Sequence, residues 1–298
     1  MRLRLVSATL VGALCVGGLS APAFAGEPAA PDRTVTTQEV AAALGDVPGL
    51  LAGSDGVTVS ADRDSAASAT TGGATVDVPK AASGEVTLAP EAGTGFAVSL
   101  PAGAADGPGT LVAPGTVAYP SGDGSANAVQ ALEGGGARML TVISVPTAAT
   151  EYRYDVSVPG GGSIALTEDG GAVVRDGSGG TVSQVAAPWA TDANGAPVPT
   201  RFSTDGTSLT QVVDHRGGGH AYPIVADPVW LVGAALAAYV VLRWALGACG
   251  LGYLSGAAQE AFFHGWVWQN VRRAGREGCV WGLLTGGAGG LARALIRR

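Results

Sequence analysis

The sequence has few charged residues, few cysteines and none of the short motifs that mark common catalytic sites. Charged residues make up 14% of its 298 residues, cysteine occurs three times and glycine occurs 48 times. Glycine is therefore far above its usual share of ~7%, which is typical of turn-rich β structure or of partly disordered chain. No Gly-x-Ser-x-Gly motif is present, so a serine hydrolase with a nucleophile elbow is not indicated. The glycine runs neither open a helix nor precede Lys-Ser/Thr, so they are not typical of phosphate loops.

The N-terminal 25 residues have the organisation of a secretory signal peptide. Arg2 and Arg4 precede an apolar stretch at 5–19, and Ala23 and Ala25 supply the small residues of a cleavage site. We expect cleavage before Gly26 and export of the mature chain. The alternative is an uncleaved N-terminal anchor, which the short apolar stretch and the well-formed cleavage site disfavour.

Removal of this signal would leave two cysteines, Cys249 and Cys279. An even pair in an exported chain is a disulfide candidate, because the compartment is oxidising. The disulfide would close a loop of about 30 residues. A pair of free buried thiols is the alternative.

Charge is distributed unevenly along the mature chain. Residues 26–226 contain 21 acidic and 8 basic residues, a net charge of −13, whereas residues 227–298 contain 3 and 7, a net charge of +4. The basic charge lies inside a very apolar segment, so a nucleic-acid binder is not indicated. The tail is instead suited to contact an anionic membrane or the acidic domain itself.

Short strands separated by glycine- and aspartate-rich turns are predicted from residue 75 onward. No amphipathic helix separates them, so an antiparallel sandwich or meander is expected rather than a parallel α/β fold. Before them, a short helix capped by Thr36 or Thr37 should present Val40, Ala43 and Leu44 on one face. Residues 60–74 lack core-forming side chains, so a loose segment is expected there. The predicted strands are 74–78, 85–88, 96–100, 110–112, 116–119, 128–132, 138–145, 152–158, 163–166, 172–175 and 181–185.

The second half of this β region contains a recognisable series of short sequence motifs. Residues 187–195 read Ala-Pro-Trp-Ala-Thr-Asp-Ala-Asn-Gly, 198–202 read Val-Pro-Thr-Arg-Phe, 209–215 read Leu-Thr-Gln-Val-Val-Asp-His, and 221–230 read Ala-Tyr-Pro-Ile-Val-Ala-Asp-Pro-Val-Trp. The stretch 152–230 resembles a module of uncharacterised secreted actinobacterial proteins, which precedes a hydrophobic, cysteine-containing C-terminal region. The resemblance implies export and a β-rich fold, and it carries no activity or catalytic residue.

Turn-forming residues and apolar core positions are enough to explain the same motifs. Turns are expected at 192–195 and at Asp205-Gly206, because Asn-Gly and Asp-Gly suit positive φ. Five apolar residues between these turns and around them are expected to fill one core face. They are Trp189, Phe202, Leu209, Val212 and Tyr222.

The C-terminal tail is predicted to form three helices, at 229–254, 257–274 and 280–296. In the second helix, apolar residues including Phe263 lie opposite Arg272 and Arg273, and Trp266 and Trp268 suit a lipid–water interface. These five residues are the membrane-contacting candidates. Glycines spaced by four, at 252 and 256 and at 282, 286 and 290, favour close packing against another helix or lipid. The alternatives are a buried core helix in a small helical domain and a flexible glycine-rich end.

Histidine provides the one pattern that suggests an enzyme. Asp214, His215 and His220 lie close together in sequence, but a metal site needs three or four ligands and a triad needs a placed nucleophile. A structural role at the end of a strand is favoured over a hydrolase using His215 or His220. His264, four residues after Glu260, is expected to be an ordinary surface histidine rather than a pH sensor. No pattern indicates a cofactor.

The sequence therefore predicts a signal peptide at 1–25, a linker with a short helix at 26–74, an acidic β-rich domain at 75–226 and an apolar, basic helical tail at 227–298. We expect a secreted, non-enzymatic protein whose tail associates with membranes, either as a bacteriocin- or toxin-like peptide or as an envelope anchor. A soluble extracellular binding or adhesion module with a helical cap is the alternative. The sequence identifies no protein partner.

Overall fold

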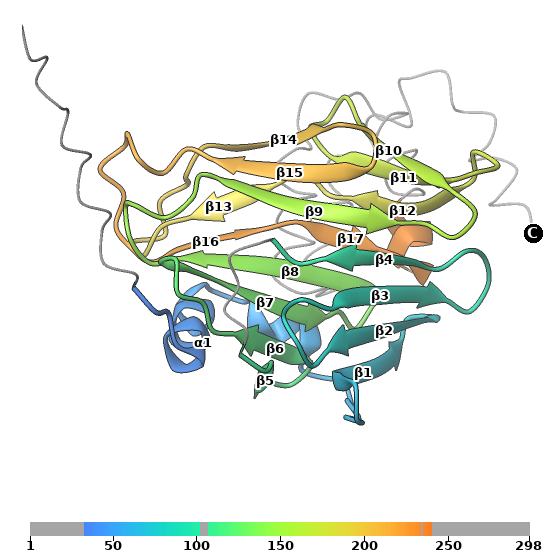
Figure 1. Cartoon of the computed structure of the whole chain (residues 1–298), viewed down its shortest axis with the longest axis horizontal. Coiled ribbons are helices and arrows are strands. Elements are labelled where there is room, and N and C mark those ends of the chain that lie inside the picture. The colour runs from blue at the N-terminus through green and yellow to red at the C-terminus, as the bar shows by residue number, and fades with distance from the viewer. Residues whose placement is uncertain (1–32, 102–106, 234, 240–298) are drawn as a thin grey trace, which may run out of the picture. The chain divides into compact units, whose positions relative to one another are not determined.

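The computed structural model describes residues 33–101, 107–233 and 235–239, which form two antiparallel sheets (Figure 1). The first sheet has seven strands in the order β1-β2-β3-β4-β9-β15-β14. They are β1 (Ser65–Thr71), β2 (Ala74–Pro79), β3 (Glu85–Pro90), β4 (Phe96–Ser99), β9 (Glu151–Ser157), β14 (Thr200–Thr204) and β15 (Ser208–Val213). The predicted mainly β, antiparallel fold is confirmed.

The second sheet has ten strands, in the order β10-β11-β12-β17-β8-β7-β6-β5, with β16 also paired to β8 and β13 paired to β16. Its strands are β5 (Thr110–Ala113), β6 (Thr116–Tyr119), β7 (Ser125–Ala131), β8 (Gly136–Ile143), β10 (Gly162–Leu166), β11 (Ala172–Asp176), β12 (Thr181–Val185), β13 (Trp189–Thr191), β16 (Ile224–Asp227) and β17 (Val229–Leu231).

The core lies between the two sheets, and period-2 alternation directs side chains into it. In β2, Ala74, Val76 and Val78 are buried while the residues between them are half-exposed. Trp230 of β17 lies at the centre, fully buried, with its ring 6.1 Å from Phe96 and 6.3 Å from Tyr154 of the opposite sheet. The predicted tail begins at residue 227, but Trp230 is a core residue of the β domain.

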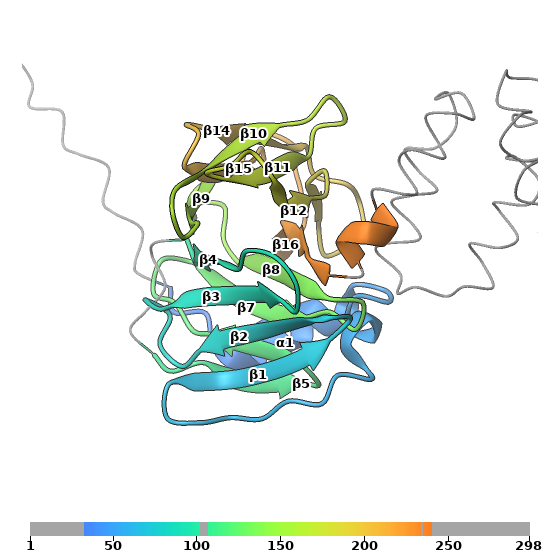
Figure 2. The same ribbon diagram turned by 90° about the vertical axis from the view of Figure 1, so that its right-hand side faces the viewer.

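The outer face of the second sheet is covered in part by α1 (Thr37–Asp46) and the 3₁₀ turn η1 (Leu51–Ser54) (Figure 2). The predicted capping of α1 is confirmed: the Glu39 amide donates to Thr36 Oγ1 (3.2 Å), and the Thr36 amide donates to Glu39 (2.8 Å). The predicted apolar face of Val40, Ala43 and Leu44 is buried. Since β7 and β8 are covered on both faces, every residue in them is buried.

Strand β8 binds two different strands along one of its edges. Its second half pairs with β16, from Thr141 to Ile143, and its first half pairs with β17, from Gly136 to Arg138. Pro228 lies between β16 and β17, and its carbonyl accepts a hydrogen bond from the Met139 amide at 3.0 Å. The predicted domain boundary after Ala226 therefore falls within β16, and the β structure continues to Leu231.

The strand at Val229–Leu231 corrects the prediction of a helix from 229 onward. An apolar run of this kind fits a buried strand as well as a helix, and pairing with β8 and β12 selects the strand. Helical conformation begins at Gly233 and is seen at 235–239. Among the described residues, no helix combines the length and the apolar character needed to cross a bilayer. The remaining predicted tail helices, at 240–298, lie outside the described residues.

The tail leaves the sheet at a contact between three glycine-containing turns. Gly72, Gly135 and Gly233 all have positive φ, and a Cβ on Gly233 would lie 2.5 Å from the Gly72 carbonyl oxygen. A Cβ on Gly135 would lie 2.9 Å from the Val232 carbonyl oxygen. Only glycine allows this approach of backbone to backbone, so the start of the tail is fixed between the β1–β2 and β7–β8 turns.

Strand β1 corrects a second prediction, that residues 60–74 form a loose segment. Ser65 to Thr71 pair with β2, and the small side chains of Ala67 and Ala69 are buried. These residues lack strong β propensity, but pairing with a neighbouring strand and burial of one face override that preference.

Thr36→Ala should destabilise the protein by about 1 kcal/mol, because the α1 N-terminus would lose its side-chain acceptor. Denaturant unfolding of the variant and of Thr37→Ala, the same substitution one residue later, would measure the effect. Equal stability of the two variants would contradict a capping role for Thr36.

Candidate functional site

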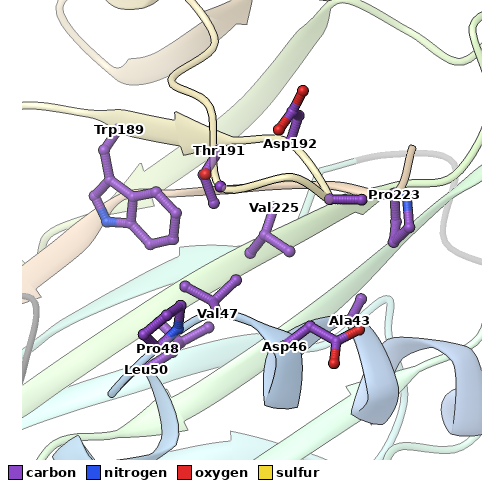
Figure 3. A pocket seen from close by; sticks show the side chains of 12 residues that line it. Ala43, Asp46, Val47, Pro48, Leu50, Trp189, Thr191, Asp192, Pro223 and Val225 are labelled. Carbon is purple, nitrogen blue, oxygen red and sulfur yellow. The ribbon is translucent and has the colours of Figure 1, made fainter. Parts of the chain in front are cut away.

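A groove opens on the outer face of the second sheet, between the end of α1 and strand β13 (Figure 3). Its volume is about 380 Å³. One wall comes from α1 and the loop after it, the other from β13 and the turn after it, and β16 supplies the floor. The side chains that shape it are Asp46, Val47, Pro48, Leu50, Trp189, Thr191, Asp192, Pro223 and Val225.

The local sequence explains why the groove is open at this point. Helix α1 ends at Asp46 because Val47 is extended and Pro48 follows it. Leu50 and Val225 are buried beneath, whereas Val47 and the indole of Trp189 are only half-buried. The groove is therefore apolar at its floor and walls, which suits an apolar or aromatic group.

Two carboxylates lie at its rim. Asp192 Oδ1 accepts from the Asn194 and Ala196 amides, each at 2.9 Å, and Oδ2 accepts from the Ala221 amide at 3.1 Å. These bonds, the one from Ala221 foremost, lower the pKa of Asp192 and keep it ionised. In Figure 3 its carboxylate points away from the groove, so it holds the predicted 192–195 turn rather than acting as a base.

Asp46, the other carboxylate, is exposed at the last residue of α1. A negative charge at a helix C-terminus is unfavourable because it faces the negative end of the helix dipole. No basic residue lies in the last turn of α1 to offset it. Asp46 therefore does not stabilise its own helix, and its carboxylate is open to a cationic group.

A buried polar network supports the groove from below. The Leu50 carbonyl accepts from Arg138 and from Gln130, both at 3.1 Å. Arg138 also donates to Gln130 Oε1 at 3.0 Å and lies 3.5 Å from the Asp227 carboxylate. This network joins the end of the α1 loop to β7, β8 and β16. Burial raises the pKa of Asp227 to about 7, against the opposing charge of Arg138 and hydrogen bonding from Trp189.

His215, a residue of the hydrolase alternative, makes structural contacts, in line with the structural role that the sequence favours. His215 is buried, and its Nε2 donates to the Ala149 carbonyl at 2.9 Å, so that nitrogen carries the proton. Its Nδ1 lies 2.8 Å from the Tyr222 hydroxyl, and the two rings meet edge to face. Burial lowers the pKa of His215. Both ring nitrogens are engaged within the protein, which leaves neither free to take a proton from a substrate.

The apolar residues around His215 lie partly as predicted. Phe202 and Leu209 are buried in the core between the sheets, and Tyr222 packs against it. Trp189 lies instead beside the α1 cluster on the outer face. The prediction for Val212 is wrong: alternation places Leu209 and Val213 inside, so a residue three positions after Leu209 faces out. Gln211 points inward and donates to the Trp189 carbonyl at 3.3 Å.

Several predicted site residues lie outside the described residues. These are the disulfide candidates Cys249 and Cys279, the membrane-contacting candidates Phe263, Trp266, Trp268, Arg272 and Arg273, and His264. In the parts of the chain that the structure describes, no three His, Cys, Asp or Glu side chains gather where they could hold a metal ion.

Comparison of the chain with protein-family models, with curated proteins and with solved structures gives no match. The resemblance to the secreted actinobacterial module stays a prediction.

Between pH 5 and pH 7.5, the free energy of unfolding should fall more in the native protein than in Asp227→Asn. The Asp227 carboxyl has an ordinary pKa of 3.8 and a folded pKa of about 7, so between these values the folded state binds the extra proton. Asp227 then makes stability fall as pH rises from about 4 to about 7, and asparagine, which resembles the protonated acid, removes this contribution.

The measurement is urea unfolding of both proteins at pH 5 and pH 7.5, with Asp55→Asn as an exposed control. The difference between the native protein and Asp227→Asn reports on Asp227 alone. Acids of lowered pKa, such as Asp205, make stability rise with pH, but they do so equally in both proteins. A larger loss of stability in Asp227→Asn at pH 7.5 than at pH 5 would contradict the prediction, since it would mean that folding lowers the pKa of Asp227 rather than raising it.

Proposed function

We propose that this is an exported, non-enzymatic protein in which the β domain carries a membrane-associating C-terminal segment. The observation that supports the proposal most is the way in which the chain leading into this segment is attached to the β domain. Strands β16 and β17 both pair with the central strand β8, and the helical residues 235–239 then pack on the same sheet. The chain that leads into the segment is therefore packed on the sheet up to Tyr239.

We call the attached stretch, residues 229–233 and 235–239, the root of the segment. It is held by side-chain packing as well as by backbone hydrogen bonds. Val229, Leu231 and Tyr239 are buried together, with Leu132 and Leu236 packed against them. The Tyr239 hydroxyl donates to Asp169 Oδ2 at 3.1 Å. Residues up to Tyr239 therefore pack as part of the β domain, and the proposed membrane-associating segment is 240–298.

With the β domain ending at Tyr239, the difference in net charge between the domain and the C-terminal segment is larger. Residues 33–239 contain 20 acidic and 8 basic residues, a net charge of −12, whereas residues 240–298 contain 2 and 7, a net charge of +5. An anionic membrane would repel the domain and attract the segment. Phe263, Trp266, Trp268, Arg272 and Arg273 remain the proposed membrane contacts, and Cys249–Cys279 remains the proposed disulfide.

Both versions of the role, a toxin-like peptide and an envelope anchor, require this contact with the membrane. A soluble binding module does not. His215, one of the two histidines of the hydrolase alternative, has both ring nitrogens engaged within the protein. Membrane contact is thus the property to test first.

The mature, oxidised protein should float with vesicles that contain anionic lipid. The double variant Arg272→Glu/Arg273→Glu should bind the vesicles at least about tenfold more weakly, because each basic residue near an anionic surface contributes about 1 kcal/mol. Flotation in a density gradient, at low and high salt, measures both. The matched control is Arg63→Glu/Arg201→Glu, which reverses two exposed charges of the β domain. If the native protein stays with the soluble fraction at low salt, the proposal fails and the binding module is favoured.

A further inference from the structure

The apolar groove beside α1 and the root of the C-terminal segment lie on the same face of the second sheet. Along β8, Arg138, Leu140 and Val142 are spaced by two and so point to one side. Val225 of β16, the groove floor, is paired with Val142, and Val229 of β17, in the root cluster, is paired with Arg138. The described chain therefore ends, at Tyr239, on the face into which the groove opens.

The chain beyond the root is long enough to reach the groove. Between Tyr239 and Phe262 there are 23 steps along the chain. A fully helical stretch of this length spans ~35 Å and an extended one ~75 Å. Either length exceeds that of β8, whose eight residues span ~27 Å and reach from the root to the groove.

The chemistry of the two surfaces is complementary. The groove offers Val47, Pro48 and Trp189 as apolar walls, with Asp46 and Asp192 at the rim. Residues 257–276 provide aromatic side chains at 262, 263, 266 and 268 and arginines at 272, 273 and 276. An aromatic group on the apolar walls with an arginine beside Asp46 satisfies both parts of the site.

The position of Asp46 is the most specific indication of a cationic occupant. Its charge opposes the dipole of its own helix, and no basic side chain in that turn compensates it. An arginine from the tail would supply the missing positive charge.

We propose that the groove between α1 and β13 binds residues 257–276 of the same chain. Binding there covers the aromatic residues of the segment with the acidic domain, so that the segment is shielded in water until a stronger partner replaces the groove. The inference needs the segment but not its membrane affinity, so it stands or falls separately from vesicle flotation.

The test is photo-crosslinking within the mature full-length protein. The photoreactive residue p-benzoylphenylalanine is placed at Pro48 or, in a second variant, at Ala193, both of which are exposed and line opposite walls of the groove. The control position is Leu166, an exposed residue of β10. Irradiation of dilute protein, followed by peptide mapping of the band with monomer mass, identifies the segment that was captured.

Both groove positions should capture residues 257–276, and Leu166 should not. Asp46→Lys should lower the yield about fivefold, as expected for loss of one partly exposed ion pair and its replacement by a like charge. The same variant should fold at least as well as the native protein, because lysine suits a helix C-terminus. Glu91→Lys, a charge reversal at an exposed site outside the groove, should leave the yield unchanged.

Three results would overturn the proposal. One is the absence of tail adducts from both Pro48 and Ala193. Another is an equal yield from Leu166, which would mean indiscriminate contact. The third is adducts found only at dimer mass, since the groove would then bind the segment of a second copy. Flotation without groove adducts would leave the membrane role intact and remove this inference alone.

Discussion

The edge of β8 that pairs with β16 and β17 is the constraint on which the rest of the structure depends. Two strands separated by one proline share that edge, and each continues into a different part of the molecule. Through β16 the pairing reaches β13 and the groove, and through β17 it reaches β12 and the start of the tail. Trp230, carried by β17, fills the centre of the core between the sheets.

The same edge joins the buried polar network to the groove. Asp227 occupies the last position of β16, where Arg138 of the neighbouring strand reaches it, and Arg138 in turn bonds the carbonyl of Leu50 in the groove wall. Burying charged side chains in a sheet that is covered on both faces costs free energy of desolvation unless each charged group has partners. The network ties the loop after α1, which lines the groove, to β7 and β8.

Much of the fold could be predicted from the sequence where a local signal was present. Thr36 and Glu39 have the spacing of a capping box, and alternating Val76 and Val78 mark a half-buried strand. Two errors arose where the signal depends on distant partners. The small residues of β1 became a strand only by pairing with β2, and Val229 to Leu231 became one only beside β8.

The groove was not predicted, because its walls come from residues about 140 positions apart in the chain, Val47 and Trp189. No periodicity links such residues, and the half-buried state of Trp189 is decided by what α1 leaves uncovered. The misplaced Val212 could have been avoided by counting, since residues three apart in a strand face opposite sides. The role of His215 depended on Tyr222 and Ala149, which only the fold brings to it.

The late position of β16 and β17 in the chain has a consequence for the order of synthesis. A chain made from its N-terminus contains β8 about 80 residues before its second edge can be paired, since Ile143 binds Ile224. Until then an apolar central strand has an unpaired edge, the feature that promotes association between chains. The strands that close this edge are made immediately before the apolar segment that follows them. A chain that ended before Ile224 would lack both strands and would keep this edge of β8 open to another chain.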